Sequence, residues 1–345
     1  MNDTFRIGFI GAGPVTQAIH LPALSTLGER WQIAKVMDVD ADVATKVASR
    51  CAAIATTHAA SIIADDDIDV VAICSPNAFH AEQTIACCKA GKRAVLCEKP
   101  LAITREEAAA VAEAAAESGT RVMVGTMHAY DPGFRAGLAE WTQQRQRVTH
   151  VKSSIFLPPN AAFVGLATES LTPGGPPPVA PGQPSPEQQR AALKQTILGL
   201  AIHHIPLVRT FFPQCGKVLS ARRLPPLGYS LLMHDGERSA ELLGFMPGQW
   251  PTSWTFEVSG AGGELAIEFP PSYVLAGSGR ATVRNPDSSR TFEFEINGYQ
   301  AQWLQLHEAL CARKPLSIPL SSAIDDLLFA LELADRAAAV MEIEQ

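Results

Sequence analysis

The chain has 345 residues, 47% of them hydrophobic and 18% charged, which is typical of a globular protein too long for one small core. Its formal net charge of −7 argues against a nucleic-acid-binding protein, because no basic surplus exists to neutralise phosphates. No apolar run approaches the roughly 20 residues that span a bilayer, so no membrane partner is expected. The opening MNDTFRIGFIG reads as a first strand and not as a signal peptide, and the seven cysteines form no C-x-x-C pair. We therefore expect reduced thiols in a cytoplasmic protein.

The first motif is the segment RIGFIGAGPVTQ, in which an apolar run leads into glycines and then into a helical segment. This order is typical of the strand, glycine-rich turn and helix of a dinucleotide-binding domain. Gly11 allows a tight turn, Gly13 lets the backbone approach a pyrophosphate, and Pro14 suits a first helical position. Thr16 stands at the third position in place of glycine or alanine, so the motif is imperfect. The cofactor-binding residues expected here are Gly11, Gly13, Pro14, Val15 and Thr16.

A second strand ends at Asp38, 22 residues after Thr16. A carboxylate at this place can accept hydrogen bonds from the ribose hydroxyls and repels a 2′-phosphate, so we expect NAD rather than NADP, with NADP as the alternative cofactor. The competing interpretation is that Asp38 caps the following helix. The upstream glycines favour the ribose role.

Strand and helix patterns continue to alternate over residues 68–127, through DVVAIC, HAEQTIACCKA, RAVLC and RVMVGTM. DVVAIC is apolar and β-branched, as a strand buried on both faces is. Thr104 precedes a helix with an acidic first turn, which is typical of an N-cap. The alternation predicts a doubly wound parallel sheet of the Rossmann type, with residues 1–125 as a dinucleotide-binding domain.

Three segments, GAGPVTQAIHLPAL, CSPNAFHAEQTIACCKAGKRAVLCEKPLA and MHAYDPGF, together resemble the Gfo/Idh/MocA oxidoreductase family. Glucose–fructose oxidoreductase and inositol dehydrogenase are its namesakes. The match is close over roughly residues 5–135, and its most specific part is the E-K-P block with the upstream S-P-N-x-x-H. The resemblance implies a first domain that binds NAD or NADP. It also implies a second α/β domain whose open, mainly antiparallel sheet forms a homodimer or homotetramer interface.

The resemblance assigns the E-K-P lysine, Lys99, a place beside the nicotinamide, where it hydrogen-bonds the reacting hydroxyl or carbonyl of the substrate. It further implies that the Lys99–Pro100 peptide is cis. Independently, Lys99 ends a parallel strand at the sheet edge where α/β proteins bind ligands, and Pro100 keeps it extended. Without the resemblance, a surface lysine at a strand end would be the preferred interpretation. The other residues that the resemblance places along the cofactor are Ser75, Asn77, His80 and Glu98.

The remainder divides into a substrate and oligomerisation domain (126–320) and a C-terminal helix that packs back on the body (321–345). Residues 171–187 are rich in proline and glycine and indicate either a flexible surface loop or a lid. Residues 186–212 are predicted to form one helix. The following short strands, separated by Gly and Pro turns, predict an antiparallel sheet.

Two adjacent histidines, His203 and His204, lie on that expected helix. Members of the family commonly carry D-x-G-x-H-x-x-D there, and His203 takes the place of the family histidine, whereas Gly199 and Pro206 replace the two aspartates. The resemblance therefore makes His203 the proton carrier, a role for which imidazole is suited. Neighbours on a helix point about 100° apart, so His204 is either a structural residue or a substrate contact from the side. No metal site is expected, because no spacing suited to a metal appears.

Two further candidates lie in the segment MHAYDP. Tyr130 is a secondary catalytic candidate, and its packing against Pro132 is the alternative. By the same resemblance, His128 lies against the nicotinamide.

The leading hypothesis is an NAD(P)-dependent dehydrogenase or reductase that acts on CH–OH. It would transfer a hydride between the nicotinamide and a sugar, an inositol or a related polyhydroxylated small molecule. The alternatives are a reductase of an imine or a non-sugar carbonyl, and a non-catalytic NAD(P)-binding sensor of the same fold. The presence of Lys99 and His203 argues against the sensor, and Gly199 and Pro206 argue weakly for it.

Overall fold

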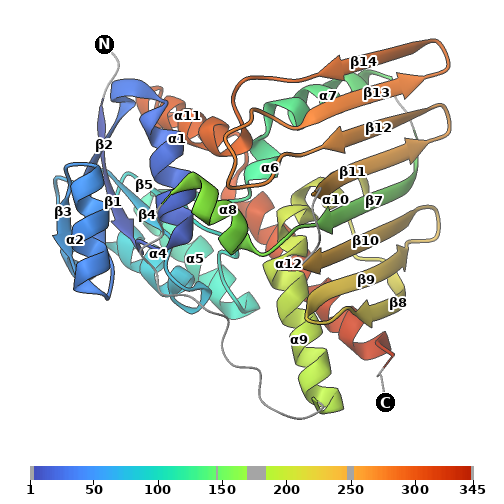
Figure 1. Ribbon diagram of the computed structural model, residues 1–345, viewed down its shortest axis with the longest axis horizontal. Coiled ribbons are helices and arrows are strands. Elements are labelled where there is room, and N and C mark those ends of the chain that lie inside the picture. Colours follow the sequence, from blue (N-terminus) through green and yellow to red (C-terminus); the bar gives the residue numbers. More distant parts are fainter. Residues whose placement is uncertain (1–3, 145–146, 169–183, 247–251, 343–345) are drawn as a thin grey trace. The chain divides into compact units, whose positions relative to one another are not determined.

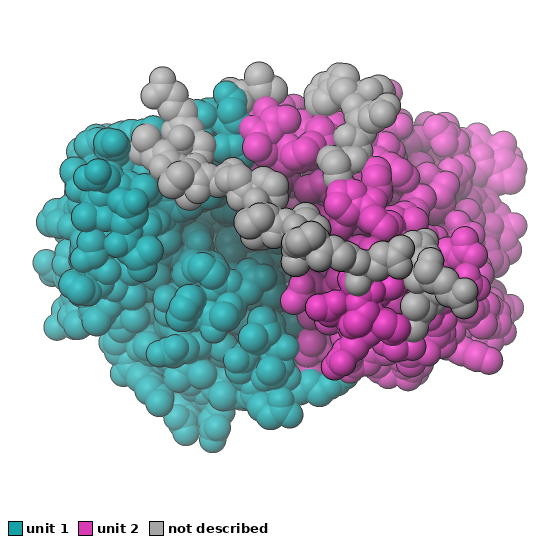
Figure 2. Space-filling view, turned by 60° about the horizontal axis from the view of Figure 1, so that its bottom comes forward, with its two compact units in different colours: residues 1–126, 164–174, 299–327 teal, residues 127–163, 175–298, 328–345 magenta. Residues whose placement is uncertain are grey.

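The computed structural model describes residues 4–144, 147–168, 184–246 and 252–342. The described residues form two compact units, which Figure 2 distinguishes by colour. The first unit lies within residues 1–126, 164–174 and 299–327, and the second within residues 127–163, 175–298 and 328–345. The domain boundaries drawn from the sequence stay a prediction, because compactness alone does not show which segment folds independently.

The first unit is built on a six-stranded parallel sheet with the order β3-β2-β1-β4-β5-β6 (Figure 1). The central strands β4 and β5 are apolar and buried throughout, as strands covered on both faces are. The strand order reverses between β1 and β4, and ligands of doubly wound sheets bind outside the carboxyl ends of strands at such a point. The predicted Rossmann sheet is thus confirmed. Its strands are β1 (Phe5–Ile10), β2 (Trp31–Met37), β3 (Ile54–Thr56), β4 (Val70–Ile73), β5 (Ala94–Cys97) and β6 (Arg121–Val124).

Helical segments connect these strands. The first of them begins with a π-helical turn, η1, and α5 begins with a capping box between Thr104 and Glu107, which confirms the predicted N-cap. The connecting segments are η1 (Thr16–His20), α1 (Leu21–Ser25), η2 (Gly28–Arg30), α2 (Ala41–Arg50), α3 (Ala60–Ile63), η3 (Asn77–Phe79), α4 (His80–Lys89) and α5 (Arg105–Ser118). From Tyr299 on, α11 (Gly298–Cys311) also belongs to this unit, whereas α8 (Asn160–Ala167) and α12 (Leu320–Val340) are each divided between the two units.

The second unit carries an eight-stranded sheet with the order β14-β13-β12-β11-β7-β10-β9-β8. Only β7 and β10 pair in parallel, so the predicted open and mainly antiparallel sheet is confirmed. Buried and half-exposed residues alternate along β11, because one face of the sheet packs on helices and the other is open. The strands are β7 (Val148–Phe156), β8 (Lys217–Arg223), β9 (Leu227–His234), β10 (Ser239–Met246), β11 (Ser253–Gly260), β12 (Gly263–Glu268), β13 (Arg280–Asn285) and β14 (Ser288–Phe292).

Helices α6 (Met127–Tyr130), α7 (Pro132–Gln143), α9 (Pro186–Gly199) and α10 (Ile205–Phe211) belong to this unit. α7 packs on β12, β13 and β14, α10 packs on β7, and α9 packs on β8 and β9. The last part of α12 lies beside α9, where Arg190 donates to the Ala338 carbonyl and Lys194 pairs with Asp335. Most of the Pro/Gly-rich segment 171–187 lies outside the described residues, but its end forms the start of α9, with Ser185 as the N-cap.

The expectation of one helix over residues 186–212 is wrong. The segment forms α9, a short 3₁₀ turn η4 (Ala201–His203) and α10, with a bend of 73° between its two halves. The cause is Pro206, which has no N–H to bond the Ile202 carbonyl and whose ring clashes with the preceding turn of a helix. His203 therefore lies on the 3₁₀ turn and does not share one α-helical face with Gly199. Among the described residues, no single helix is long and apolar enough to cross a membrane, and the bent pair passes only by length and composition.

Candidate active site

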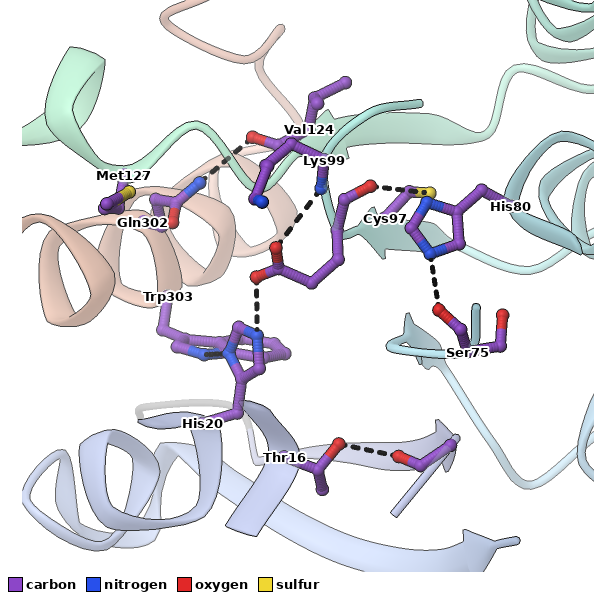
Figure 3. A network of polar contacts seen from close by, with 12 residues as sticks. Thr16, His20, Ser75, His80, Cys97, Lys99, Val124, Met127, Gln302 and Trp303 are labelled. Atoms are coloured by element: carbon purple, nitrogen blue, oxygen red, sulfur yellow. Dashed lines mark hydrogen bonds and ion pairs between the residues drawn. The ribbon is translucent and has the colours of Figure 1, made fainter. Parts of the chain in front are cut away.

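The glycine turn after β1 has the geometry that the sequence predicts. Gly11 has a φ of +98°, and a Cβ there would lie 2.6 Å from the Cys74 carbonyl, so no other residue fits without strain. Around Gly13, by contrast, a Cβ would meet nothing within 4 Å, which leaves the backbone open to a ligand. The Thr16 hydroxyl donates to the Gly11 carbonyl at 2.6 Å and so stabilises the turn (Figure 3). The imperfect third position of the motif therefore has a structural role of its own.

Asp38 lies at the end of β2 and is half-buried. Its carboxylate accepts from the Ala12 N–H at 3.0 Å and from the Asp40 N–H at 3.1 Å. The interpretation of Asp38 as a helix cap is wrong, because Asp40 caps α2 and accepts from the backbone of Asp42 and Val43. The structure instead attaches Asp38 to the glycine turn itself.

His80 connects the segments that follow β4 and β5 through contacts with two backbone carbonyls. It is 1% exposed, its Nε2 lies 2.8 Å from the Ser75 carbonyl, and its Nδ1 lies 2.7 Å from the Pro100 carbonyl. The Lys99–Pro100 peptide is cis, as the resemblance implies. Both ring nitrogens of His80 are thus directed at the backbone, whereas Asn77 is exposed and the Ser75 hydroxyl donates to Gln83.

Glu98 is buried, and each of its two carboxylate oxygens has a partner. Oε1 lies 3.0 Å from His20 Nε2, and Oε2 accepts from the Lys99 backbone N–H at 3.2 Å. A Cβ on Gly125 would lie 2.9 Å from Oε1, so this glycine makes room for the carboxylate. Burial on its own raises the pKa of Glu98, but the hydrogen bond of His20 and the charge of the Lys99 side chain together lower it.

Lys99 is half-buried at the carboxyl end of β5. Burial lowers the pKa of its side chain, and the charge of Glu98 opposes this effect. A lysine with a lowered pKa exchanges its proton closer to neutral pH than an ordinary surface lysine. The chemistry available at this strand end is therefore hydrogen bonding or proton transfer to a substrate oxygen.

The second unit gives the two adjacent histidines different surroundings. His204 is completely buried and bonded through Nδ1 to the Ser153 hydroxyl at 2.7 Å, and burial lowers its pKa to about 3. His203 is half-buried, with Nδ1 3.4 Å from the Met127 sulfur and its ring edge-on to Trp254 at 5.4 Å. This arrangement supports the structural alternative for His204 and leaves His203 as the more accessible of the two.

His128 and Tyr130 lie on α6 and are both buried. His128 stacks on Phe269 with ring centroids 3.9 Å apart, and burial followed by the charge of His204 lowers its pKa. His128 thus belongs to an aromatic cluster with His204, Phe269 and Trp254.

Each unit therefore brings together its own share of the expected residues. The first unit gathers the glycine turn, Asp38, Ser75, His80, Glu98 and Lys99 at the carboxyl ends of its strands, and the second gathers His128, His203 and His204. Among the described residues, no group of three or more His, Cys, Asp or Glu side chains could hold a metal ion. The sequence analysis missed His20 and Trp303, which support Glu98. His20 stands within the segment that carries the resemblance, but a lone histidine on an apolar helix gives no signal of such a role.

The buried His204 makes the stability of the fold dependent on pH. Its pKa in the folded state lies below the ordinary 6.5, so only the unfolded chain takes up a proton as the pH falls below 6.5, and stability is lost. We expect His204 to account for about 2 kcal/mol of the stability lost between pH 7 and pH 5. His204→Asn keeps a polar partner for Ser153 but cannot titrate, so it should lose about 2 kcal/mol less over this range. Urea unfolding at both pH values measures this, and equal pH dependence in the two proteins would contradict it.

Comparisons with known proteins agree with this geometry. Residues 5–126 match the model of the oxidoreductase family with an NAD-binding Rossmann fold, Gfo/Idh/MocA. Inositol 2-dehydrogenase 3 of Saccharopolyspora erythraea is 40% identical over 133 residues, which are 38% of this chain and 39% of that protein. The 1,5-anhydro-D-fructose reductase of Ensifer adhaerens is 35% identical over 152 residues, 39% of this chain and 45% of that protein. The chain thus matches less than half the length of these relatives.

Similarity of structure extends further than similarity of sequence. A 3-ketoreductase from Actinomadura kijaniata, solved with TDP-benzene and NADP in an open conformation, matches with a TM-score of 0.74 at 18% identity. The match covers 99% of this chain and 98% of that one, and at this identity it shows the fold alone. Residues 5–126 are thus similar to the NAD-binding Rossmann domain of the Gfo/Idh/MocA oxidoreductase family, and the first unit has the fold of an NAD(P)-binding Rossmann domain.

Proposed function

We propose that this protein is an NAD(P)-dependent oxidoreductase acting on a CH–OH group or the matching carbonyl of a sugar, an inositol or a related polyhydroxylated small molecule. The observation that carries the proposal is Lys99, which has a lowered pKa and stands at the carboxyl end of β5 in the same unit as the open glycine turn. The matched segment of the named relatives, an inositol dehydrogenase and an anhydrofructose reductase, supports this substrate class.

The residues present fit a dinucleotide. Gly13 leaves its backbone accessible, and Asp38 directly follows β2, where a ribose would be bound. The nicotinamide, when bound, accepts or supplies the hydride. Lys99 then hydrogen-bonds the substrate oxygen and stabilises the charge that develops on it. His203 takes or returns the hydroxyl proton, and Tyr130 is a secondary candidate for this step.

Lys99→Met tests the catalytic role directly. We would assay inositol with NAD, and 1,5-anhydro-D-fructose with NADH and NADPH. The variant should lower kcat by about 10²- to 10⁴-fold, because it removes the group that bonds the reacting oxygen. Its affinity for NADH, followed by nicotinamide fluorescence, should stay close to that of the native protein.

Lys89→Met, at the exposed end of α4, is the matched control and should change neither quantity. Equal turnover by the native protein and Lys99→Met would contradict the role of Lys99. A native protein that binds NADH but turns over none of these compounds would favour the sensor, or a reductase of imines or other carbonyls.

The cofactor we propose is NAD in preference to NADP. An Asp38 carboxylate held by the Ala12 N–H next to the glycine turn would lie close to a 2′-phosphate and repel it. We expect Asp38→Ser to tighten NADPH binding by about tenfold and to weaken NADH binding, because the charge and the ribose acceptor are both lost. Asp42→Ser on α2 is the control. Fluorescence titration with both cofactors measures the change, and an unaltered NADH to NADPH ratio in Asp38→Ser would refute the assignment.

We also propose a cytoplasmic homodimer or homotetramer. All seven cysteines are free thiols, which suits a reducing compartment. The open face of the second sheet carries Arg280 and Arg284 near Glu268, a mixed-charge surface able to pair with its own copy. Light scattering should give two or four times the chain mass of 36.9 kDa. A monomer at micromolar concentration would contradict this proposal.

A further inference from the structure

His20 lies where the glycine turn and the Glu98–Lys99 segment meet. It is the last residue of the π-helical turn η1 and has no exposed surface. Its Nε2 lies 3.0 Å from Glu98 Oε1, and the indole Nε1 of Trp303 donates to its Nδ1 at 3.2 Å. Figure 3 shows the His20 ring beside Trp303, with contacts from both ring nitrogens. The histidine thus bridges α11 and the buried carboxylate.

The hydrogens in this chain of contacts all point toward Glu98. An indole N–H can only donate, so Nδ1 of His20 presents a lone pair and the ring proton is on Nε2. That proton faces Glu98 Oε1, and the Lys99 backbone N–H faces Oε2. The geometry therefore describes a neutral His20 that donates to an ionised Glu98.

Two charged or titratable neighbours act on this ring from the strand ends. Burial lowers the pKa of His20, whereas Cys74 and the Glu98 carboxylate raise it to about 10, a shift that on its own favours the doubly protonated, charged ring. The Trp303 N–H opposes a second proton, because it occupies Nδ1. Protons cannot pass along the series Trp303–His20–Glu98, since the indole N–H only donates and cannot accept a proton. The arrangement is therefore suited to holding Glu98 in place and not to conducting protons.

We propose that His20 is a positioning residue that keeps Glu98 ionised and oriented behind Lys99, with Trp303 fixing the tautomer that does so. This inference depends on the proposed function in one respect only, which is that Lys99 takes part in catalysis. Thr16 at the start of η1 bonds the Gly11 carbonyl, and His20 at its end bonds Glu98, so one π turn links the cofactor-binding loop to the lysine. Such π turns are frequent at functional sites.

The test compares three histidine variants of the full-length protein. His20→Leu removes the donor and the acceptor, whereas His20→Gln retains one of each in the side-chain amide. His307→Leu is the matched control, since His307 is a buried histidine on α11 that packs against Phe5 and Trp31. The readout is the pH dependence of acetic anhydride labelling at Lys99, followed by peptide mass spectrometry. It requires no substrate.

We expect the labelling midpoint of Lys99 to fall by about one pH unit in His20→Leu, because a displaced or protonated Glu98 no longer stabilises the ammonium. His20→Gln and His307→Leu should match the native protein. If His20→Leu does not fold, Trp303→Phe takes its place and should shift the midpoint in the same direction. An unshifted midpoint in the folded His20 or Trp303 variant overturns the proposal, as does an equal shift in His307→Leu.

The proposed function is judged separately. A native protein without turnover, whose Lys99 midpoint still depends on His20, would refute the oxidoreductase activity and leave the positioning role intact. In an active enzyme, His20→Leu should lower kcat by about tenfold with little change in KM, because substrate binding is not the affected step. A change confined to KM would overturn the positioning role.

Discussion

The site of the first unit depends on one interaction, the burial of the Glu98 carboxylate. A charge taken out of water costs several kcal/mol unless hydrogen bonds replace its hydration. Here one oxygen faces His20 and the other accepts from the Lys99 backbone, and Gly125 leaves the space. The π turn η1, which positions His20, and the helix α11, which positions Trp303, are both needed to give the buried Glu98 carboxylate this hydrogen bond. The backbone of Lys99 is consequently held by a hydrogen bond to the Glu98 carboxylate, which also places a negative charge beside this lysine.

In the second unit, burial instead favours the neutral form of the buried histidines. His128 and His204 lie among Phe269 and Trp254, where burial disfavours the imidazolium form. Pro206 breaks the helix so that His203 falls on a short turn beside this cluster. Of these three neighbouring histidines, only His203 is left partly accessible.

Local patterns predicted much of this fold. The glycine turn, the strand that leads into Glu98 and Lys99, and the N-cap at Thr104 depend on residues close together in sequence, and each is found in the structure. The support of Glu98 could not be predicted, because Trp303 is 283 positions from His20 and only packing brings them together. The break at Pro206 had a local signal, but the long apolar run favoured a continuous helix. The competing interpretation of Asp38 places the cap of α2 on the wrong carboxylate, because Asp38 and Asp40 both precede the helix in sequence and only the structure shows that Asp40 accepts from the Asp42 N–H.

The central claim is that the nicotinamide end of the cofactor binds next to Lys99. Cofactor protection tests it most directly: the native protein is labelled with acetic anhydride with and without saturating NADH, and modification is quantified at each lysine. The account predicts that NADH slows modification of Lys99 severalfold and leaves the exposed Lys89 unchanged. NADH that binds to the protein without slowing the labelling of Lys99 would contradict it.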